Sequence, residues 1–276
     1  MEMAKKKFNP LPGFGLTMGC TLLYLSVLVL LPIGALLFRA AQLSWSDFWR
    51  LTTDTRALAA YKLTFGAAFI AAVINAVFGT LLAWVLVRYR FFGRRFIDAL
   101  VDFPFALPTA VAGLTLSSLF AANGWLGQFL VPLGIKGVYT PLAVVIALTF
   151  VGLPFVVRTL QPVLENFERE VEEAAATLGA SRRRTFFRIL MPALFPTVLT
   201  GFALAFARAV GEYGSIMFVS GNLPGKTEIA PHVIVVRLEQ FDFGGATAIA
   251  AVLLVISAGI LALINWLEVW ARRFNE

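Results

Sequence analysis

Two opposite charges inside an apolar segment are the clearest candidates in this sequence for binding an ion. Arg208 and Glu212 are four residues apart in the stretch from Ala193 to about Val219, so on a helix their side chains share a face. A guanidinium there offers two parallel hydrogen-bond donors to an anion, while the carboxylate limits how tightly the anion is held. The same spacing is also typical of an ion pair whose role is to hold helices in place. We favour this structural role over direct contact with an anion.

Other reactive residue types are too few for familiar catalytic chemistry. His232 is the only histidine and Cys20 the only cysteine, which leaves no pattern typical of a histidine-based triad, an internal disulfide or a multi-cysteine metal site. The chain also lacks a Gly-x4-Gly-Lys-Ser/Thr phosphate loop, so it would not bind ATP in that way. We therefore predict no catalytic residue, no metal site and no cofactor in this chain. Energy for any transport would come from a partner or an ion gradient.

The composition of the chain is very apolar, and this indicates the kind of helices that position these charges. Of the 276 residues, 59% are hydrophobic and 14% are charged, whereas soluble domains average about 45–50% and about 25%. The net charge of +7, from 23 basic and 16 acidic side chains, is spread in short clumps between apolar runs rather than gathered on one basic arm. We therefore expect a chain that lies in a lipid bilayer and has no nucleic-acid partner.

Six apolar stretches are long enough to cross a bilayer, whose hydrocarbon core of about 30 Å needs about 20 helical residues. They are Leu16–Phe38, Leu63–Val87, Phe103–Ala122, Tyr139–Val157, Ala193 to about Val219, and Ala246–Leu267. Pro104 and Pro108 predict that the entry to the third stretch is bent or unwound. With the N-terminus inside, 15 of the 23 basic residues fall in inner segments and 7 in outer ones, leaving Arg208 within a span. The predicted fold is an all-α membrane protein with six transmembrane helices and both termini in the cytoplasm.

The longest inner segment, residues 158–192, is charged and patterned. Five glutamates within residues 165–173 precede Gly179 and Ser181, and four arginines follow before Pro192. Glycine at 179 can close a helix in the left-handed conformation, and Ser181 can cap the next helix. The pattern predicts a helix, a tight turn and a second helix below the membrane. This hairpin either pairs its own acidic and basic side chains in solvent or docks on another protein.

The hairpin resembles the EAA loop of importer-type ABC permeases. The resemblance covers residues 165–192 and rests on Glu173, Ala174, Ala175, Gly179, Ile189 and Pro192, with Met191 where that family usually has leucine. It implies that the hairpin docks on a cytoplasmic ATPase and transmits the closure of that ATPase to the membrane helices. It also implies the fold of a type I ABC importer permease.

A closer resemblance covers nearly the whole chain and is to the T-type permease subunits of sulfate/thiosulfate importers. It rests on the motifs Phe8–Leu16, Leu81–Arg90, Pro104–Gly113, Ala205–Gly214, Gly221–Pro224 and Thr227–Pro231. It implies a multi-pass protein of the bacterial inner membrane and a heterodimer with a W-type permease. Two copies of a cytoplasmic ABC ATPase, which hold ATP and magnesium, and a periplasmic sulfate/thiosulfate-binding protein complete the implied assembly.

The resemblance also implies an outer docking loop and a division of the chain. Polar and proline residues between Gly221 and Pro231 are expected to be exposed and to receive the binding protein; the candidates are Asn222, Pro224, Thr227, Glu228 and Pro231. Residues 1–60 would form a cytoplasmic tail, the first membrane helix and an outer loop. Residues 61–268 would form the five-helix permease core, and residues 269–276 a cytoplasmic tail.

Other functions stay open at this point. An ion-gradient secondary transporter would use intramembrane charges as ion sites, with Asp98, Asp102, Arg208 and Glu212 as candidates, but it leaves the EAA-like loop unexplained. A structural or sensory scaffold would show no transport with or without an ATPase. Within the importer class the sequence does not separate sulfate from thiosulfate or from another oxyanion such as molybdate, because the resemblance assigns selection largely to the binding protein.

Overall fold

The fold is described by a computed structural model that covers residues 13–167 and 169–273. Five helical segments in these ranges are long and apolar enough to span a membrane: Phe14–Ala41, Thr55–Arg88, Pro141–Glu165, Arg182–Val210 and Phe243–Trp270. Each overlaps a predicted span, and the remaining predicted span is present as the shorter apolar helix Thr109–Phe120. Predictions for residues 1–12, Glu168 and 274–276 lie outside the described residues.

The described elements are all helical. In chain order they are α1 (Phe14–Leu25), the π-helical turn η1 (Ser26–Leu30), α2 (Leu31–Ala41), α3 (Trp45–Thr52), α4 (Thr55–Arg88), α5 (Arg94–Val101), α6 (Phe103–Ala106), α7 (Thr109–Phe120), α8 (Gly127–Leu130), the 3-10 turn η2 (Val131–Leu133), α9 (Pro141–Glu165), α10 (Arg169–Thr177), α11 (Arg182–Thr185), the π-helical turn η3 (Phe186–Leu190), α12 (Met191–Val210), α13 (Gly214–Val219), α14 (Ala230–Glu239) and α15 (Phe243–Arg273).

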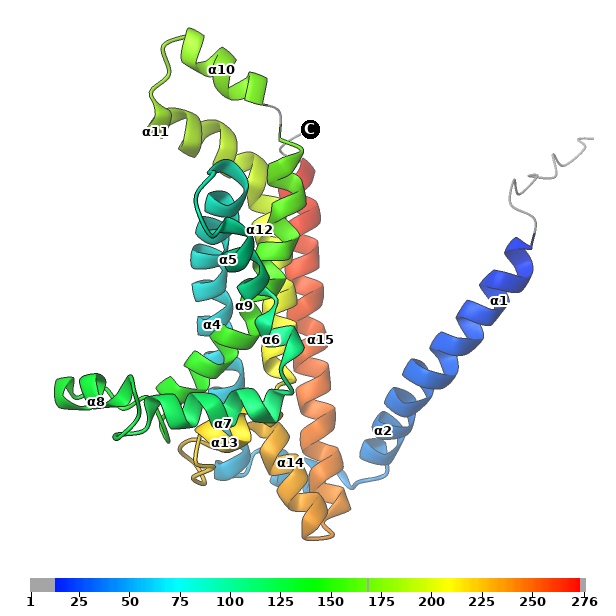
Figure 1. Ribbon diagram of the computed structural model, residues 1–276. Helices are drawn as coiled ribbons and strands as arrows, with labels where there is room; N and C mark the ends of the chain where they lie inside the picture. The colour runs from blue at the N-terminus through cyan, green and yellow to red at the C-terminus, as the bar shows by residue number, and fades with distance from the viewer. Residues whose placement is uncertain (1–12, 168, 274–276) are drawn as a thin grey trace, which may run out of the picture.

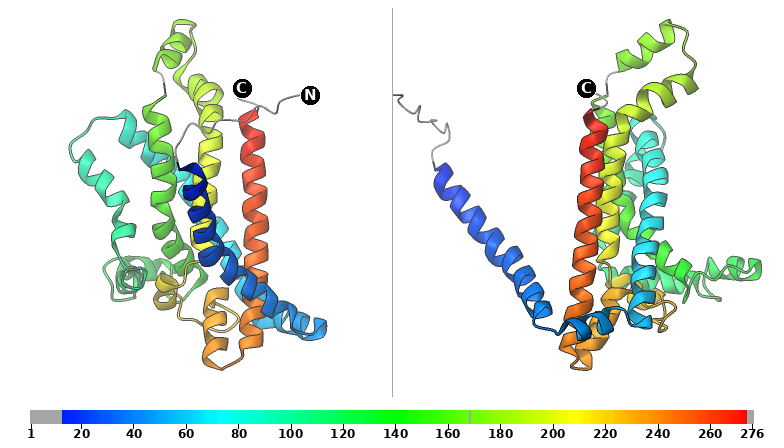
Figure 2. Two further views of the ribbon diagram at one scale, coloured as in Figure 1. Left: turned by 90° about the vertical axis from the view of Figure 1, so that its right-hand side faces the viewer. Right: turned by 180° about the vertical axis from the view of Figure 1, so that it is seen from behind.

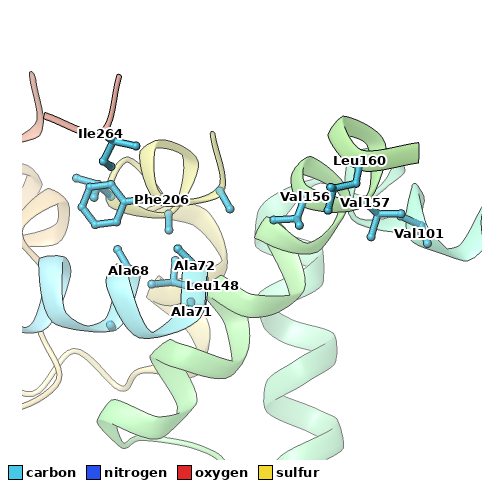
Figure 3. Packing of buried hydrophobic residues seen from close by; sticks show 14 of the residues in the cluster. Ala68, Ala71, Ala72, Val101, Leu148, Val156, Val157, Leu160, Phe206 and Ile264 are labelled. Atoms are coloured by element: carbon cyan, nitrogen blue, oxygen red, sulfur yellow. The ribbon is translucent and has the colours of Figure 1, made fainter. Parts of the chain in front are cut away.

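The core of the molecule is a bundle in which α4, α9, α12 and α15 run along one another (Figure 1). Small residues on α4 let its neighbours approach closely, and in lipid this van der Waals contact takes the place of the hydrophobic effect. Ala68 and Ala72 are fully or almost fully buried, and Phe206 of α12 faces them (Figure 3). At Gly79 the approach is so close that a Cβ atom would lie 2.9 Å from Cγ1 of Val156 on α9.

The third predicted span is broken by its prolines. Pro104 lies in the short helix α6, and Pro108 comes directly before α7, so helical hydrogen bonding is interrupted between the two. The 12 residues of α7 measure about 18 Å, which is less than the hydrocarbon thickness. In Figure 1, α7 runs across the long helices rather than along them. The fifth predicted span is also interrupted, because α12 ends at Val210 and α13 begins only at Gly214.

The α10–α11 segment and the end of α15 lie at one end of the bundle, and α14 lies at the opposite end (Figure 1). The start of α1 points toward the same side as α10 and α11 but lies away from the bundle (Figure 1). This arrangement matches the topology predicted from the basic residues, in which both termini and the charged hairpin are cytoplasmic. The first spanning segment leans away from the bundle (Figure 2). Within α1 and α2 the only buried residue is Ala40, and the segment meets the bundle through α2, which contacts α15.

The close packing at Gly79 gives a test of the bundle. We expect Gly79→Leu to lower the stability of the protein by roughly 1–3 kcal/mol, because the added side chain would overlap Val156. Thermal unfolding in detergent measures the effect. Gly66→Leu on the same helix is the matched control, because the space around Gly66 is open. Equal unfolding temperatures for both variants would show that α4 does not pack on α9 in this way.

Candidate functional site

The predicted hairpin is present, and we call residues 169–190 the EAA-like hairpin. Helix α10 ends in a turn where Gly179 has φ +78° and the amide of Ala180 donates to the carbonyl of Ala175 at 3.0 Å. Ser181 then caps α11, since its hydroxyl accepts from the amide of Arg184 at 3.3 Å. Both predicted signals therefore act as expected: the glycine adopts a conformation that costs other residues energy, and the serine satisfies a free amide.

The residues that carry the EAA resemblance divide between exposed and buried positions. Glu173, Ala174 and Gly179 are exposed, and the neighbouring Leu178 has 88% of its surface exposed. Ala175 is buried at 6% exposure. The second leg of the hairpin leads through the half-buried Ile189 into α12, where Pro192 is exposed. An exposed leucine beside exposed Glu173 at the end of a membrane bundle is a surface suited to a protein partner.

One interpretation of the sequence expected the hairpin to pair its own charges, but among the side chains that the structure describes no ion pair joins two residues of the hairpin. Among the described residues, the ion pair of α10 joins Glu172 to Arg88 at the end of α4, with 2.8 Å between Oε1 and the guanidinium nitrogen. This contact could not be predicted from the sequence, because Arg88 and Glu172 are far apart in the chain. The hairpin is therefore attached to the bundle by charge, and the arginines of α11 are exposed.

Arg208 and Glu212 form the predicted ion pair, with Glu212 only 2% exposed. The other carboxylate oxygen, Oε1, accepts from the amide of Ser215 at 2.9 Å and from its hydroxyl at 3.0 Å. Glu212 thus neutralises the charge of Arg208 and satisfies free donors at the start of α13. These contacts support the structural reading of the pair. The Arg208 side chain keeps 32% exposure, and a role in the anion pathway stays a prediction.

The outer loop is only partly as predicted. Pro224 is exposed, and Asn222 and Pro231 are half-buried. The expectation of exposure is wrong for Thr227 and Glu228, which are each 2% exposed. The hydroxyl of Thr227 accepts from the amide of Leu223 at 2.9 Å, which closes the loop on itself.

Glu228 anchors the loop to the start of α4. Its two carboxylate oxygens accept from Nε of Arg56 at 2.7 Å and from a terminal nitrogen of the same guanidinium at 2.5 Å. A buried carboxylate needs such a partner, and its burial could not be read from the local sequence because Arg56 lies 172 residues earlier. A docking surface on this loop would therefore consist of the tip around Asn222 and Pro224.

A second charge cluster, missed by the sequence analysis, joins α5 to α9. Arg158 donates to Asp102 at 2.6 and 2.7 Å, to Asp98 at 2.8 Å and to Gln161 at 2.5 Å. We call these four residues the Arg158 cluster. Burial alone would raise the pKa of Asp98, but the hydrogen bonds from Gln161 and Arg158 lower it overall. Both carboxylates accept hydrogen bonds from Arg158, which disfavours them as the ion sites of a gradient-driven carrier.

No metal centre emerges from these charges. In residues 13–167 and 169–273, no three His, Cys, Asp or Glu side chains are grouped so that they could hold a metal ion. Five acidic residues in this part of the chain, Asp98, Asp102, Glu172, Glu212 and Glu228, instead pair with arginines. Such pairs fix helix ends and loops in place and carry no catalytic chemistry of their own.

The chain matches, over residues 75–273, the family described as the inner membrane component of binding-protein-dependent transport systems. It belongs to this family, and it is a multi-pass membrane permease. It is 55% identical to the "Probable sulfate transport system permease protein cysT" of Nephroselmis olivacea, over 92% of this chain and 89% of the relative. It is also 50% identical to the "Sulfate transport system permease protein CysT" of Salmonella typhimurium, over 94% of this chain and 93% of the relative.

A solved structure gives the same fold. A bacterial ABC transporter that imports the acidic polysaccharide alginate contains a chain that matches with a TM-score of 0.74 and 15% identity. The match covers 95% of this chain and 96% of that one. At this identity the similarity shows the fold alone, and the fold is that of a type I ABC importer permease.

The Arg158 cluster gives a prediction about stability. Arg158→Gln leaves Asp98 and Asp102 without their shared donor. Because the two carboxylates are 41% and 50% exposed, water screens the pair, and we expect a loss of roughly 0.5–1 kcal/mol. Because folding lowers the pKa of Asp98, the contribution of the cluster is present above the ordinary carboxyl range and is lost as the pH falls below it. Thermal unfolding at neutral pH measures the loss. Arg90→Gln, at an exposed position near the same end of the bundle, is the control, and an equal effect of both changes would contradict the prediction.

Proposed function

We propose that the chain is the membrane-spanning permease subunit of an ATP-driven importer that moves sulfate or thiosulfate into the cytoplasm. The observation that carries the proposal is the exposed EAA-like hairpin, which stands at the end of the bundle assigned to the cytoplasm and is continuous with two core helices, α9 and α12. The substrate follows from the relatives, whose names describe sulfate transport permeases. The chain itself supplies coupling and passage, and hydrolysis of ATP takes place on a partner.

The partners of this importer are proposed from the same features. The hairpin, with Leu178 and Glu173 exposed, supports docking of a cytoplasmic ABC ATPase, of which two copies would hold ATP and magnesium. The nearly unburied α1–α2 segment supports a second permease, the W-type subunit, as a partner within the bilayer. On the opposite side, in the periplasm of a bacterial inner membrane, the loop tip at Asn222 and Pro224 would receive a sulfate/thiosulfate-binding protein. A crystal structure of an alginate transporter with its periplasmic protein has the same permease fold.

The main rivals are a permease for another oxyanion, such as molybdate, and an ion-gradient carrier. The gradient carrier is disfavoured because Asp98, Asp102 and Glu212 each have charged partners in the structure. The oxyanion alternative differs only in the anion that the binding protein delivers. Competition between anions therefore decides between sulfate, thiosulfate and molybdate.

Transport measurements test the proposed function directly. In proteoliposomes that contain the chain, its partner permease, the ATPase and the binding protein, we expect uptake of labelled sulfate that requires ATP. A protonophore should leave this uptake unchanged, and unlabelled thiosulfate should compete more strongly than molybdate. Uptake that persists without ATP and collapses with the protonophore would instead establish the gradient carrier.

The docking role of the hairpin has its own test. We expect the double variant Glu173→Ala, Gly179→Ala to lose co-purification of the ATPase, because it removes an exposed charge and strains a turn whose φ is +78°. A non-glycine residue in this conformation costs roughly 1–2 kcal/mol. Lys226→Gln, at an exposed site in the outer loop, should retain the ATPase. Undiminished co-purification with the double variant would place ATPase docking elsewhere.

A further inference from the structure

The EAA-like hairpin is joined by the chain to α9 and α12 but not to α4. Helix α9 leads into the hairpin, and η3 leads out of it into α12, so both helices follow its displacement directly. Helix α4 ends at Arg88 and continues into α5, so only non-covalent contacts connect α4 to the hairpin. If the bundle of an importer moves as one unit, the non-covalent contacts between α4 and the hairpin must persist during the movement.

Packing along the bundle holds α4 against α9 and α12. The surface of α4 that faces these helices is rich in small residues, including Ala68, Ala72 and Gly79, and it also buries larger side chains such as Leu86. Close van der Waals packing of this kind holds the helices together in lipid. A contact between α4 and the hairpin itself lies at the end of α4.

Two contacts at the end of α4 join it to the hairpin. The guanidinium of Arg88 lies 2.8 Å from Glu172 of α10, and the Arg88 side chain is only 10% exposed. The same guanidinium lies over the ring of Trp84, 5.3 Å from its centre. Trp84 in turn meets the ring of Phe186, at the start of η3, edge to face at 5.7 Å. One turn of α4 thus contacts both legs of the hairpin.

The ion pair is not fully satisfied in this arrangement. Buried atoms of Arg88 (Nε and a terminal nitrogen) and of Glu172 (Oε1) make no hydrogen bond of regular geometry with the described residues, despite the short distance. A cavity of about 430 Å³ lies beside them and is lined by Trp84, Glu172, Glu173 and Phe186 among others. Hydrogen bonds between charged groups depend on alignment, and the cavity leaves space for the hairpin to move, so the strength of the contact depends on the position of the hairpin.

We propose that Arg88 is a positioning residue for transport, which passes the displacement of the EAA-like hairpin to α4 through its ion pair with Glu172. The inference rests on the proposed importer function. Trp84 holds the guanidinium in place, and Phe186 keeps the two legs of the hairpin in register with the end of α4. Without the pair, the hairpin moves α9 and α12 while α4 lags behind, and ATP is hydrolysed without completed transport.

The test compares Arg88→Gln, Glu172→Gln and the double variant in the reconstituted importer. Sulfate uptake and ATP hydrolysis are measured in the same proteoliposomes. We expect each single variant to bind the ATPase normally and to lower the number of sulfate ions imported per ATP by about fivefold or more, the low end of usual coupling effects. The double variant should be no worse than either single one, because both changes remove the same contact. The charge-exchanged protein, with Arg88→Glu and Glu172→Arg, should recover part of the ratio.

Three results would overturn the proposal. The first is an unchanged ratio of sulfate to ATP in Arg88→Gln, and the second is additive losses in the double variant. The third is a drop of equal size in Arg90→Gln, which removes an exposed positive charge two residues away. If Arg88→Gln fails to assemble, the partly exposed Glu172→Gln gives the same readout. Failure of the proposed function itself looks different, since the unaltered protein would then import no sulfate or retain no ATPase.

Discussion

The close approach of α4, α9 and α12 through small side chains is the contact on which the rest of the molecule depends. Within lipid there is no gain from moving apolar side chains away from water, so the helices stay together through dense van der Waals packing. Ala68, Ala72 and Gly79 make that density possible. The ends of the helices are held in addition by charged contacts at the two ends of the bundle.

Those charged contacts share one design. A single arginine joins elements that are distant in the chain: Arg56 holds the outer loop at Glu228, Arg158 holds α5 to α9, and Arg88 holds the hairpin to α4. A guanidinium suits this role because its planar array of donors can serve several oxygen atoms at once. Each pair lies near the end of a long helix rather than at its centre, where the cost of desolvation would be greatest.

The sequence predicted what depends on local pattern and missed what depends on distant partners. Apolar length placed the spans, and Gly179 with Ser181 placed the turn of the hairpin, because both signals act within a few residues. The ion pairs of Arg88 and Arg158 were missed, since Glu172 and Asp98 lie 84 and 60 residues away in the chain. The burial of Thr227 and Glu228 was missed for the same reason: polar type suggests exposure, and only the fold shows that Arg56 covers the carboxylate.

The first spanning segment, α1 to α2, has a consequence for how the protein is made. Its backbone hydrogen bonds are satisfied within the helix, and its side chains face outward with only Ala40 buried, so its structure does not require the later helices. A segment of this kind is complete as soon as it enters the bilayer, before the ribosome has produced the remaining helices. The first segment can therefore insert into the membrane before the other helices are made, and these helices then assemble next to it.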